Sequence, residues 1–165
     1  SYVNELNVDQ ERGYVFGKGK AYGIELFLKK RTGKLNGWIG YTLARSDRKF
    51  ADLNEGKIFP AKYDRTNDLT INLAYDFNKE WTIATTFVYA TGNAITPVTG
   101  IGLIEFSPFF IYGQRNSIRV PAYHRMDFSL NYAPIPKRRP NRRFRSSYNI
   151  SIYNVYNRKN TRYLV

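Results

Sequence analysis

Hydrophobic and polar residues alternate strictly over residues 68–77 of the chain. One face of this stretch would carry Leu69, Ile71, Leu73, Tyr75 and Phe77, and the other Asp68, Thr70, Asn72, Ala74 and Asp76. A period of two predicts a β-strand with one apolar and one polar face. The stretch is as long as a tilted strand must be to cross a lipid bilayer. Its aromatic pair stands at one end, where a membrane interface favours such rings.

The same alternation recurs along the rest of the chain. It predicts five more strands, over residues 21–30, 35–46, 81–92, 125–133 and 145–156, and it leaves residues 1–20 as a loop. Gly33 supplies the positive φ angle that a tight turn at residues 31–34 needs. No segment of useful length has the helical period. We therefore predict an all-β fold, an antiparallel up-and-down meander of about six strands.

The connections between the predicted strands alternate in length. Residues 31–34 and 78–80 are short turns, whereas residues 47–67 and 93–124 are long connections. Within the second long connection, we expect residues 101–106 and 109–111 to pack on each other. Short turns on one side and long loops on the other are typical of bacterial outer-membrane barrels. Six strands are too few to close such a barrel, so residues 1–165 are predicted to be a single region of a larger one.

Composition narrows the choice of partners and chemistry. The chain has 26 Lys and Arg residues against 13 acidic ones, a net charge of +13 that favours an anionic partner. Its 14 tyrosines suit a boundary between apolar and aqueous surroundings. The absence of cysteine excludes disulfides, thiolate zinc sites and a cysteine nucleophile. No run of 18 apolar residues predicts a membrane-spanning helix, and no signal peptide is visible at Ser1.

Six short segments, in this order, carry a family resemblance. They are residues 19–26 (GKAYGIEL), 37–43 (GWIGYTL), 59–65 (FPAKYDR), 89–92 (YATG), 121–127 (PAYHRMD) and 153–157 (YNVYN). Together they resemble the C-terminal barrel region of TonB-dependent outer-membrane receptors of the type abundant in Bacteroidetes. The resemblance covers the chain from about Gly17 to Asn160.

This resemblance implies a plugged transmembrane barrel of about 22 strands in the bacterial outer membrane. It implies active uptake of a siderophore, vitamin, oligosaccharide or peptide, powered through TonB, with no cofactor and no enzymatic step. The implied partners are outer-membrane lipid, the receptor's own plug domain, the TonB system and a surface lipoprotein, but not nucleic acid. Because the chain shows no plug, no TonB-contacting segment and no final aromatic-ended strands, we expect it to be a fragment.

Charged and polar residues on the predicted strands suggest where contacts could form. The polar faces carry Glu25, Asp68, Asn72, Asp127, Asn131 and Asn149, which a packed core would not accept unpaired. We expect these side chains to line a lumen and favour contact with a plug over contact with substrate. Tyr63, Asp64 and Arg65, like Arg125 and Asp127, stand where a long loop meets a strand. Loop anchoring by ion pairs is our preferred interpretation, and a ligand-contacting rim is the alternative.

A basic turn joins the last two predicted strands. It carries Lys137, Arg138, Arg139, Arg142 and Arg143 and no acidic residue. Nucleic-acid binding would need aromatic rings for base stacking, and only Phe144 is present. In a barrel these charges would meet lipid phosphates, each worth about 1 kcal/mol near an anionic surface. A solvated turn is an equally good interpretation.

The sequence offers no catalytic constellation. His124 is the only histidine, and no second metal ligand or nucleophile stands near it. Two alternatives to a receptor wall stay open. The chain could be a soluble basic β-domain that binds nucleic acid or acidic glycans, with the apolar faces as its core. It could also form a small barrel by self-assembly.

Overall fold

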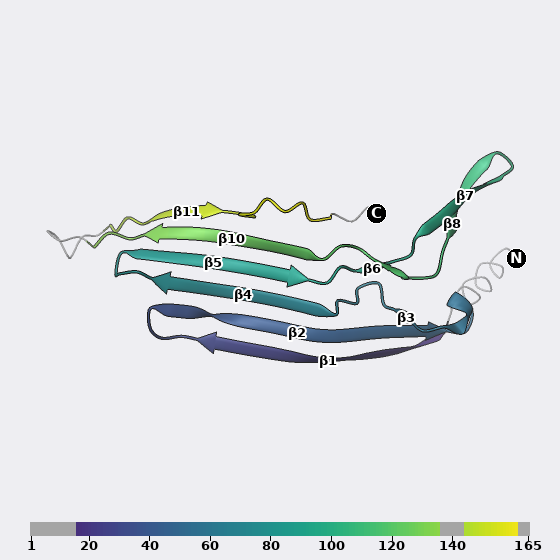
Figure 1. Cartoon of the computed structure of the whole chain (residues 1–165), viewed down its shortest axis with the longest axis horizontal. Coiled ribbons are helices and arrows are strands. Elements are labelled where there is room, and N and C mark those ends of the chain that lie inside the picture. Colours follow the sequence, from purple (N-terminus) through teal and green to yellow (C-terminus); the bar gives the residue numbers. More distant parts are fainter. Residues whose placement is uncertain (1–15, 136–143, 162–165) are drawn as a thin grey trace, which may run out of the picture. The chain divides into compact units, whose positions relative to one another are not determined.

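The computed structural model describes residues 16–135 and 144–161. Regular structure in this part of the chain consists of β-strands and one short 3-10 helix, η1 (Asn54–Gly56). The largest sheet has seven strands in the order β1-β2-β4-β5-β10-β11, with β3 paired to β2 (Figure 1). Each pair whose register is recorded is antiparallel. The structure therefore confirms the all-β fold and the antiparallel sheet. No sheet formed by the described residues closes on itself.

Six strands of this sheet overlap the six predicted stretches, and the short β3 lies in a segment that was predicted to be a connection. They are β1 (Gly17–Lys30), β2 (Leu35–Phe50), β3 (Phe59–Pro60), β4 (Asn67–Asp76), β5 (Trp81–Ala90), β10 (Tyr123–Tyr132) and β11 (Tyr148–Ile152). The short connections at residues 31–34 and 77–80 are confirmed, as are the long ones between β2 and β4 and between β5 and β10.

The loop predicted up to residue 20 is wrong for residues 17–20, which open β1. A Cβ atom on Gly17 would lie 2.3 Å from the ring of Phe50, so only glycine lets the two strands approach there. Strand β2 likewise runs to Phe50 rather than to residue 46. Its extension pairs with β3, where Asp47 faces Pro60. Cross-strand pairing thus extends both strands beyond their alternating segments.

The last strand is shorter than the predicted residues 145–156. After Ile152 the backbone leaves the extended region, with a φ of 53° at Asn154 and 52° at Asn157. Asparagine tolerates this left-handed conformation better than most residues. The amide of Val155 still donates to the carbonyl of Met126 at 2.8 Å, so this segment stays beside β10.

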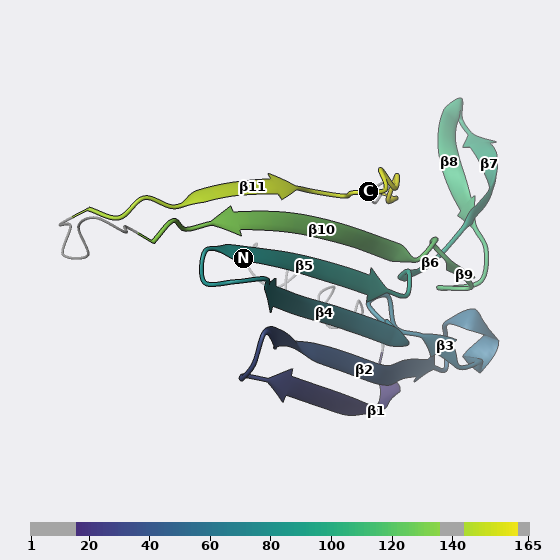
Figure 2. The same ribbon diagram turned by 60° about the vertical axis from the view of Figure 1, so that its left-hand side comes forward.

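The second long connection contains two small antiparallel sheets. One pairs β6 (Ala94–Ile95) with β9 (Ile118–Arg119). The other is a hairpin of β7 (Val98–Ile104) and β8 (Ser107–Tyr112), which the view in Figure 2 shows as a separate twisted pair. Ile101 lies opposite Phe110 in this hairpin, which confirms the expected packing of residues 101–106 on 109–111.

The chain divides into two compact units. One comprises Ser1–Tyr22, Arg45–Asp64 and Asn93–Arg119, and the other Gly23–Ala44, Arg65–Gly92 and Val120–Val165. We call them the loop unit and the sheet unit. The expectation of one barrel region over residues 1–165 stays a prediction. Among the described residues, the buried apolar side chains are Phe59, Ala61, Ala90 and Ala94. The large apolar side chains of the sheet unit are therefore not packed into a core of this part of the chain.

Candidate functional site

The sheet unit gathers its apolar side chains on one face. Residues that face each other in adjacent strands point to the same side of a sheet. The register places Ile39 beside Ile71, Ile71 beside Phe87, and Phe87 beside Met126. Leu130 likewise stands between Ile83 and Ile150. The alternation predicted in single strands therefore becomes one continuous apolar surface across β2, β4, β5, β10 and β11.

Aromatic rings bound this apolar face at the short-turn end. The ring centroids of Trp81 and Tyr132 are 4.4 Å apart, and those of Tyr132 and Tyr148 are 6.3 Å apart. Tyr75 meets Phe77 edge-on at 5.2 Å in the same end of the sheet unit. Such stacked rings form a row that crosses neighbouring strands rather than following one strand.

A second row bounds the other end of the face. Tyr89 stacks on His124 at 6.4 Å, and the Nδ1 atom of His124 lies 2.8 Å from the hydroxyl oxygen of Tyr156. On the neighbouring strands the hydroxyl of Tyr41 donates to Asn67 at 2.7 Å. The side-chain amide of Asn67 in turn lies 3.3 Å from the hydroxyl of Thr91. The polar groups of this row thus mark the edge of the apolar face, within which Thr85 turns its hydroxyl to the carbonyl of Asp127 at 3.1 Å.

The opposite face of the sheet unit is a polar network. Asn72 donates to the hydroxyl of Thr86 at 3.0 Å. Asn149 donates to Asn131 at 2.6 Å and to Ser129 at 2.9 Å. These bonds join adjacent strands, so the polar side chains satisfy one another while remaining partly open to solvent. This confirms that the polar residues of the alternating strands share a face.

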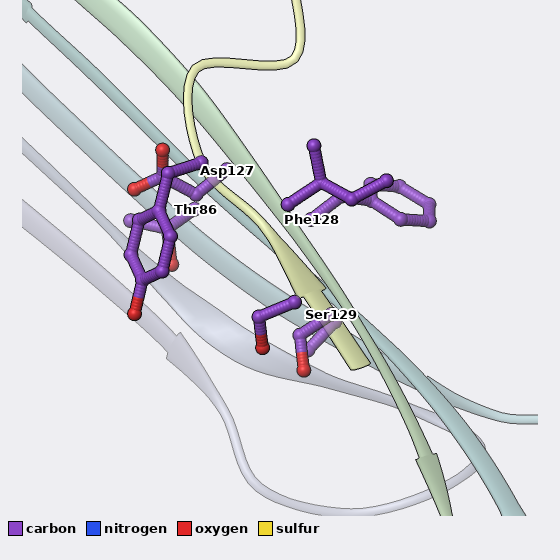
Figure 3. A pocket seen from close by; sticks show the side chains of 8 residues that line it. Thr86, Asp127, Phe128 and Ser129 are labelled. Atoms are coloured by element: carbon purple, nitrogen blue, oxygen red, sulfur yellow. The ribbon is translucent and has the colours of Figure 1, made fainter. Parts of the chain in front are cut away.

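Asp127 lies at the edge of a hollow on this polar face (Figure 3). The hollow is about 160 Å³ and is lined by Ala84, Thr86, Asp127, Phe128, Ser129, Ser151, Ile152 and Tyr153. The Asp127 carboxylate accepts from Arg125 at 2.9 Å and from the amide of Asn154 at 2.9 Å. The contact with Asn154 holds the segment after β11 against β10, whereas the contact with Arg125 lies within β10. The structure therefore brings Arg125 and Asp127 together as an anchoring pair.

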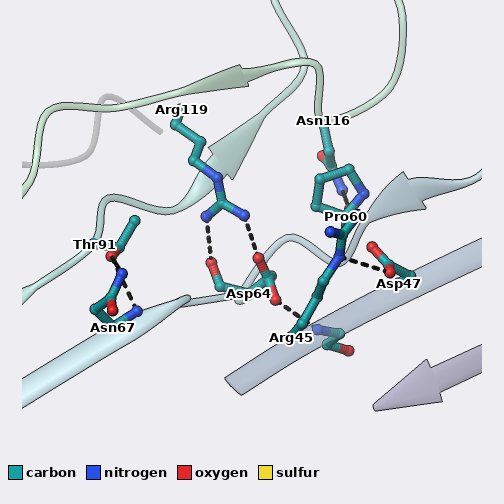
Figure 4. Close-up of polar contacts among 9 residues, drawn as sticks. Arg45, Asp47, Pro60, Asp64, Asn67, Thr91, Asn116 and Arg119 are labelled. Atoms are coloured by element: carbon teal, nitrogen blue, oxygen red, sulfur yellow. Dashed lines mark hydrogen bonds and ion pairs between the residues drawn. The ribbon is translucent and has the colours of Figure 1, made fainter. Parts of the chain in front are cut away.

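In the loop unit, Asp64 joins the two long connections (Figure 4). Its side chain is only 2% exposed and forms an ion pair with Arg119. It also accepts from the amide of Ser46 at 2.6 Å, and Arg119 donates to the Asp64 carbonyl at 2.9 Å. Asn116 adds a bond to the carbonyl of Pro60 at 2.8 Å. These contacts tie residues 60–64 to residues 116–119.

The other predicted contact residues lie apart from these two anchors. Glu25 is exposed on β1, and Tyr63 is exposed with the ammonium of Lys62 5.7 Å from its ring centroid. Arg65 forms an ion pair with Asp68 at 3.7 Å. Lys137, Arg138, Arg139, Arg142 and Arg143 lie outside the described residues, so the head-group contacts expected of them stay a prediction.

The described residues also bear on metal and membrane chemistry. Nowhere among them do three His, Cys, Asp or Glu side chains gather so that they could hold a metal ion. No helix in the same part of the chain is both long and apolar enough to cross a membrane.

In the loop unit, the hydrogen bond from Lys57 lowers the pKa of the exposed Glu55 carboxyl.

Sequence reasoning missed the partner of Asp64, which is Arg119, and that of the Pro60 carbonyl, which is Asn116. Arg119 and Asn116 stand more than fifty residues away, and nothing in their local sequence indicates a contact. It also missed a group of basic residues at the start of β1 and the end of β2. There the signal was available, because Lys18 and Lys20 continue the period-two pattern of Tyr22 and Ile24.

The structure defines an all-β protein whose largest sheet is an antiparallel meander with one apolar and one hydrogen-bonded polar face. No protein-family model, curated protein or solved structure matches the chain.

Proposed function

We propose that the chain is a wall segment of a TonB-dependent receptor in the bacterial outer membrane. The receptor takes up a siderophore, vitamin, oligosaccharide or peptide, and this segment binds and conducts without making or breaking a bond. Outer-membrane lipid surrounds it, and its further partners are the plug domain, the TonB system and a surface lipoprotein.

One observation carries the proposal: the cross-strand register collects the apolar residues of five strands into one face bounded by aromatic rows. From Trp81 to Tyr89 the rows are eight residues apart, or about 27 Å along the strand. At a tilt of about 40° this is about 21 Å along the membrane normal, close to the apolar band of about 25 Å in outer-membrane barrels. A lipid environment would solvate this face, which the described residues leave uncovered.

The edges of the sheet support the same proposal. The order of the strands ends at β1 and at β11, so each presents an edge that no described strand pairs. Unpaired edges of this length are templates for aggregation unless further strands cover them. In the proposed receptor, the other strands of a barrel of about 22 pair with both edges.

Labelling of intact cells tests the proposed location. The chain has no cysteine, so Lys62→Cys and Lys79→Cys each add one thiol to it, and the full-length protein without either substitution is the control for labelling elsewhere. Lys62 lies in the connection between β2 and β4, and Lys79 in the short turn between β4 and β5. A membrane-impermeant maleimide should label Lys62→Cys on intact cells and Lys79→Cys only after the outer membrane is permeabilised. Labelling of both only after cell lysis would contradict the proposal, and would leave a soluble basic β-domain as the better account.

A further inference from the structure

A pocket of about 420 Å³ lies in the loop unit, where the β7–β8 hairpin ends. Its walls come from the two long connections, and every lining residue belongs to the loop unit. The lining residues are Leu53, Asn54, Thr96, Tyr112, Gly113 and Arg115. Sites for small molecules usually measure about 300–1,000 Å³ and combine apolar walls with a few polar groups. The pocket therefore has the size and the mixed lining of a ligand site. We call it the loop pocket.

Hydrogen bonds between the two connections fix the shape of the loop pocket. The main-chain amide of Arg115 donates to the side-chain oxygen of Asn54 at 3.2 Å. The amide of Asn116 donates to the hydroxyl of Thr96 at 3.0 Å. The side chain of Asn116 also donates to the Pro60 carbonyl at 2.8 Å. A ligand would thus meet walls that are already in place, which lowers the entropic cost of binding.

The backbone beside the loop pocket is strained. Asn54, Glu55 and Gly56 follow one another with φ angles of 55°, 56° and 71°, and Asn116 has a φ of 52°. Asparagine and glycine tolerate this left-handed conformation, but glutamate does not favour it. Strained residues persist only where their surroundings hold them, and they gather at ligand sites. The strain therefore marks residues 54–56 and 116 as parts of a built site.

Three side chains of the loop pocket keep binding capacity for a ligand. The guanidinium of Arg115 forms no ion pair with any carboxylate of the described residues. The side chain of Asn54 uses its oxygen in the bond to Arg115, and its NH₂ group has no recorded acceptor in the described part of the chain. Tyr112 is 63% exposed, so its ring and hydroxyl are accessible. The pocket thus offers a cation, an amide donor and an aromatic ring.

The charge of the loop unit favours an anion. Its described residues include nine basic and five acidic side chains, a net charge of +4. A surplus of positive charge attracts anionic ligands over a distance of about 10 Å at moderate salt. Within the pocket, the planar guanidinium of Arg115 matches a carboxylate, which it can bind through two parallel hydrogen bonds.

The main chain of the loop pocket disfavours an extended peptide. A peptide that adds to a strand edge needs free main-chain donors. The amides of Arg115 and Asn116 are already bonded, and that of Gly113 donates to the Pro97 carbonyl at 2.9 Å. A sugar ring has different needs, because its hydroxyls bond to side chains and its C–H face packs on an aromatic ring. The exposed groups of the pocket suit an acidic sugar better than a peptide.

We propose that the loop pocket binds a uronic acid residue of an oligosaccharide. The sugar carboxylate pairs with Arg115, the sugar ring packs on Tyr112, and a ring hydroxyl accepts from the NH₂ group of Asn54. The inference rests on the proposed function and narrows the substrate of the receptor to an acidic oligosaccharide.

Calorimetric titration of the full-length protein in neutral maltoside micelles tests this site. The probes are trigalacturonate and a hyaluronan tetrasaccharide, and at least one of them should bind. Arg115→Gln should weaken this binding about tenfold or more, because hydrogen bonds between charged partners are the strong ones. Arg48→Gln removes the same charge from an exposed arginine of the loop unit outside the pocket and should bind normally. Limited proteolysis of residues 51–66 should proceed at the same rate in both variants, which shows that the loops remain folded.

The aromatic wall is tested with a pair of variants. Tyr112→Phe keeps the ring and should bind the acidic sugar about as well as the unmodified protein. Tyr112→Leu removes the ring and should bind it about three- to tenfold less tightly. The methyl ester of trigalacturonate, which has the same sugar rings without the charge, should bind the unmodified protein as weakly as the acid binds Arg115→Gln.

Several results would overturn the inference. They are binding of neither uronate, equal weakening by Arg48→Gln and Arg115→Gln, equal affinity for the methyl ester, and equal affinity for triglutamate, a peptide of the same charge as trigalacturonate. Failure of the proposed function looks different. Intact cells would then leave Lys62→Cys unlabelled, whatever the purified protein binds. Labelling in the expected pattern without uronate binding would refute the loop pocket alone.

Discussion

At the scale of single residues, Asp64 shows how a charged side chain can organise two loops. Its carboxylate is buried, and its contacts come from β2, through Ser46, and from residue 119. An ion pair at such a site is costly to break, because the remaining charge stays partly desolvated. Exposed pairs such as Glu55–Lys57 contribute far less.

Asp64→Asn should loosen the two long connections. The variant keeps the size of the side chain but removes the charge that meets Arg119, at a cost of about 1–2 kcal/mol. Limited proteolysis should cut residues 51–66 about tenfold faster, if loop opening is in rapid equilibrium. Glu55→Gln, a matched charge removal at an exposed pair, should be cut at the rate of the unmodified chain. Equal rates in the two variants would show that Asp64 does not fasten the loops.

Gly37→Ala should destabilise the sheet unit. Gly37 has a φ of 144°, and a Cβ there would lie 2.1 Å from the carbonyl oxygen of Asn72. Backbone strain and this clash should together cost about 2 kcal/mol or more. Gly40→Ala on the same strand is the control, because its nearest new contact is an ordinary 3.5 Å from Trp38. The midpoint of denaturant unfolding in micelles should fall for the first variant only. A similar midpoint for both would contradict the close strand approach.

At the scale of elements, the sequence predicted the strands better than their ends. Alternation located β4 and β5 within one or two residues, because their apolar and polar faces are both well defined. It missed the first residues of β1, where glycines favour a loop locally but allow contact with Phe50 in the sheet. It overextended the last strand, where Asn154 and Asn157 adopt positive φ angles. Strand ends depend on cross-strand partners, which local patterns do not reveal.

Ile71→Lys tests which face of β4 meets lipid. Ile71 faces Phe87 between the aromatic rows, and a lysine deep in the bilayer costs up to about 2–4 kcal/mol on the lipid face of a barrel. Folding yield in lipid vesicles should therefore drop sharply. Thr70→Lys, one residue away on the polar face, should fold normally. The reverse order of yields would assign the polar face to lipid.

At the scale of the whole molecule, the sequence alone predicts only some of the contacts between residues. The pairing of Arg125 with Asp127 follows from two residues on one strand face, and the sequence pointed to both. The Asp64–Arg119 pair joins two connections, and only folding brings them together. The apolar face was predictable in part. The alternation within each strand indicates that strand's apolar residues, but only the register shows that these residues and the aromatic rings align across the strands.

The central claim is that this apolar face meets lipid and the polar face meets water. Nitroxide labels placed singly from Leu69 to Tyr75, in the protein reconstituted in lipid bilayers, test it directly. Collisions with oxygen should be frequent at Leu69, Ile71 and Leu73. Collisions with a water-soluble nickel complex should instead be frequent at Thr70, Asn72 and Ala74. A period of two in opposite phase for the two reagents would support the wall of a membrane barrel. Labels at Leu69, Ile71 and Leu73 that neither reagent reaches would show a packed protein core and contradict the account.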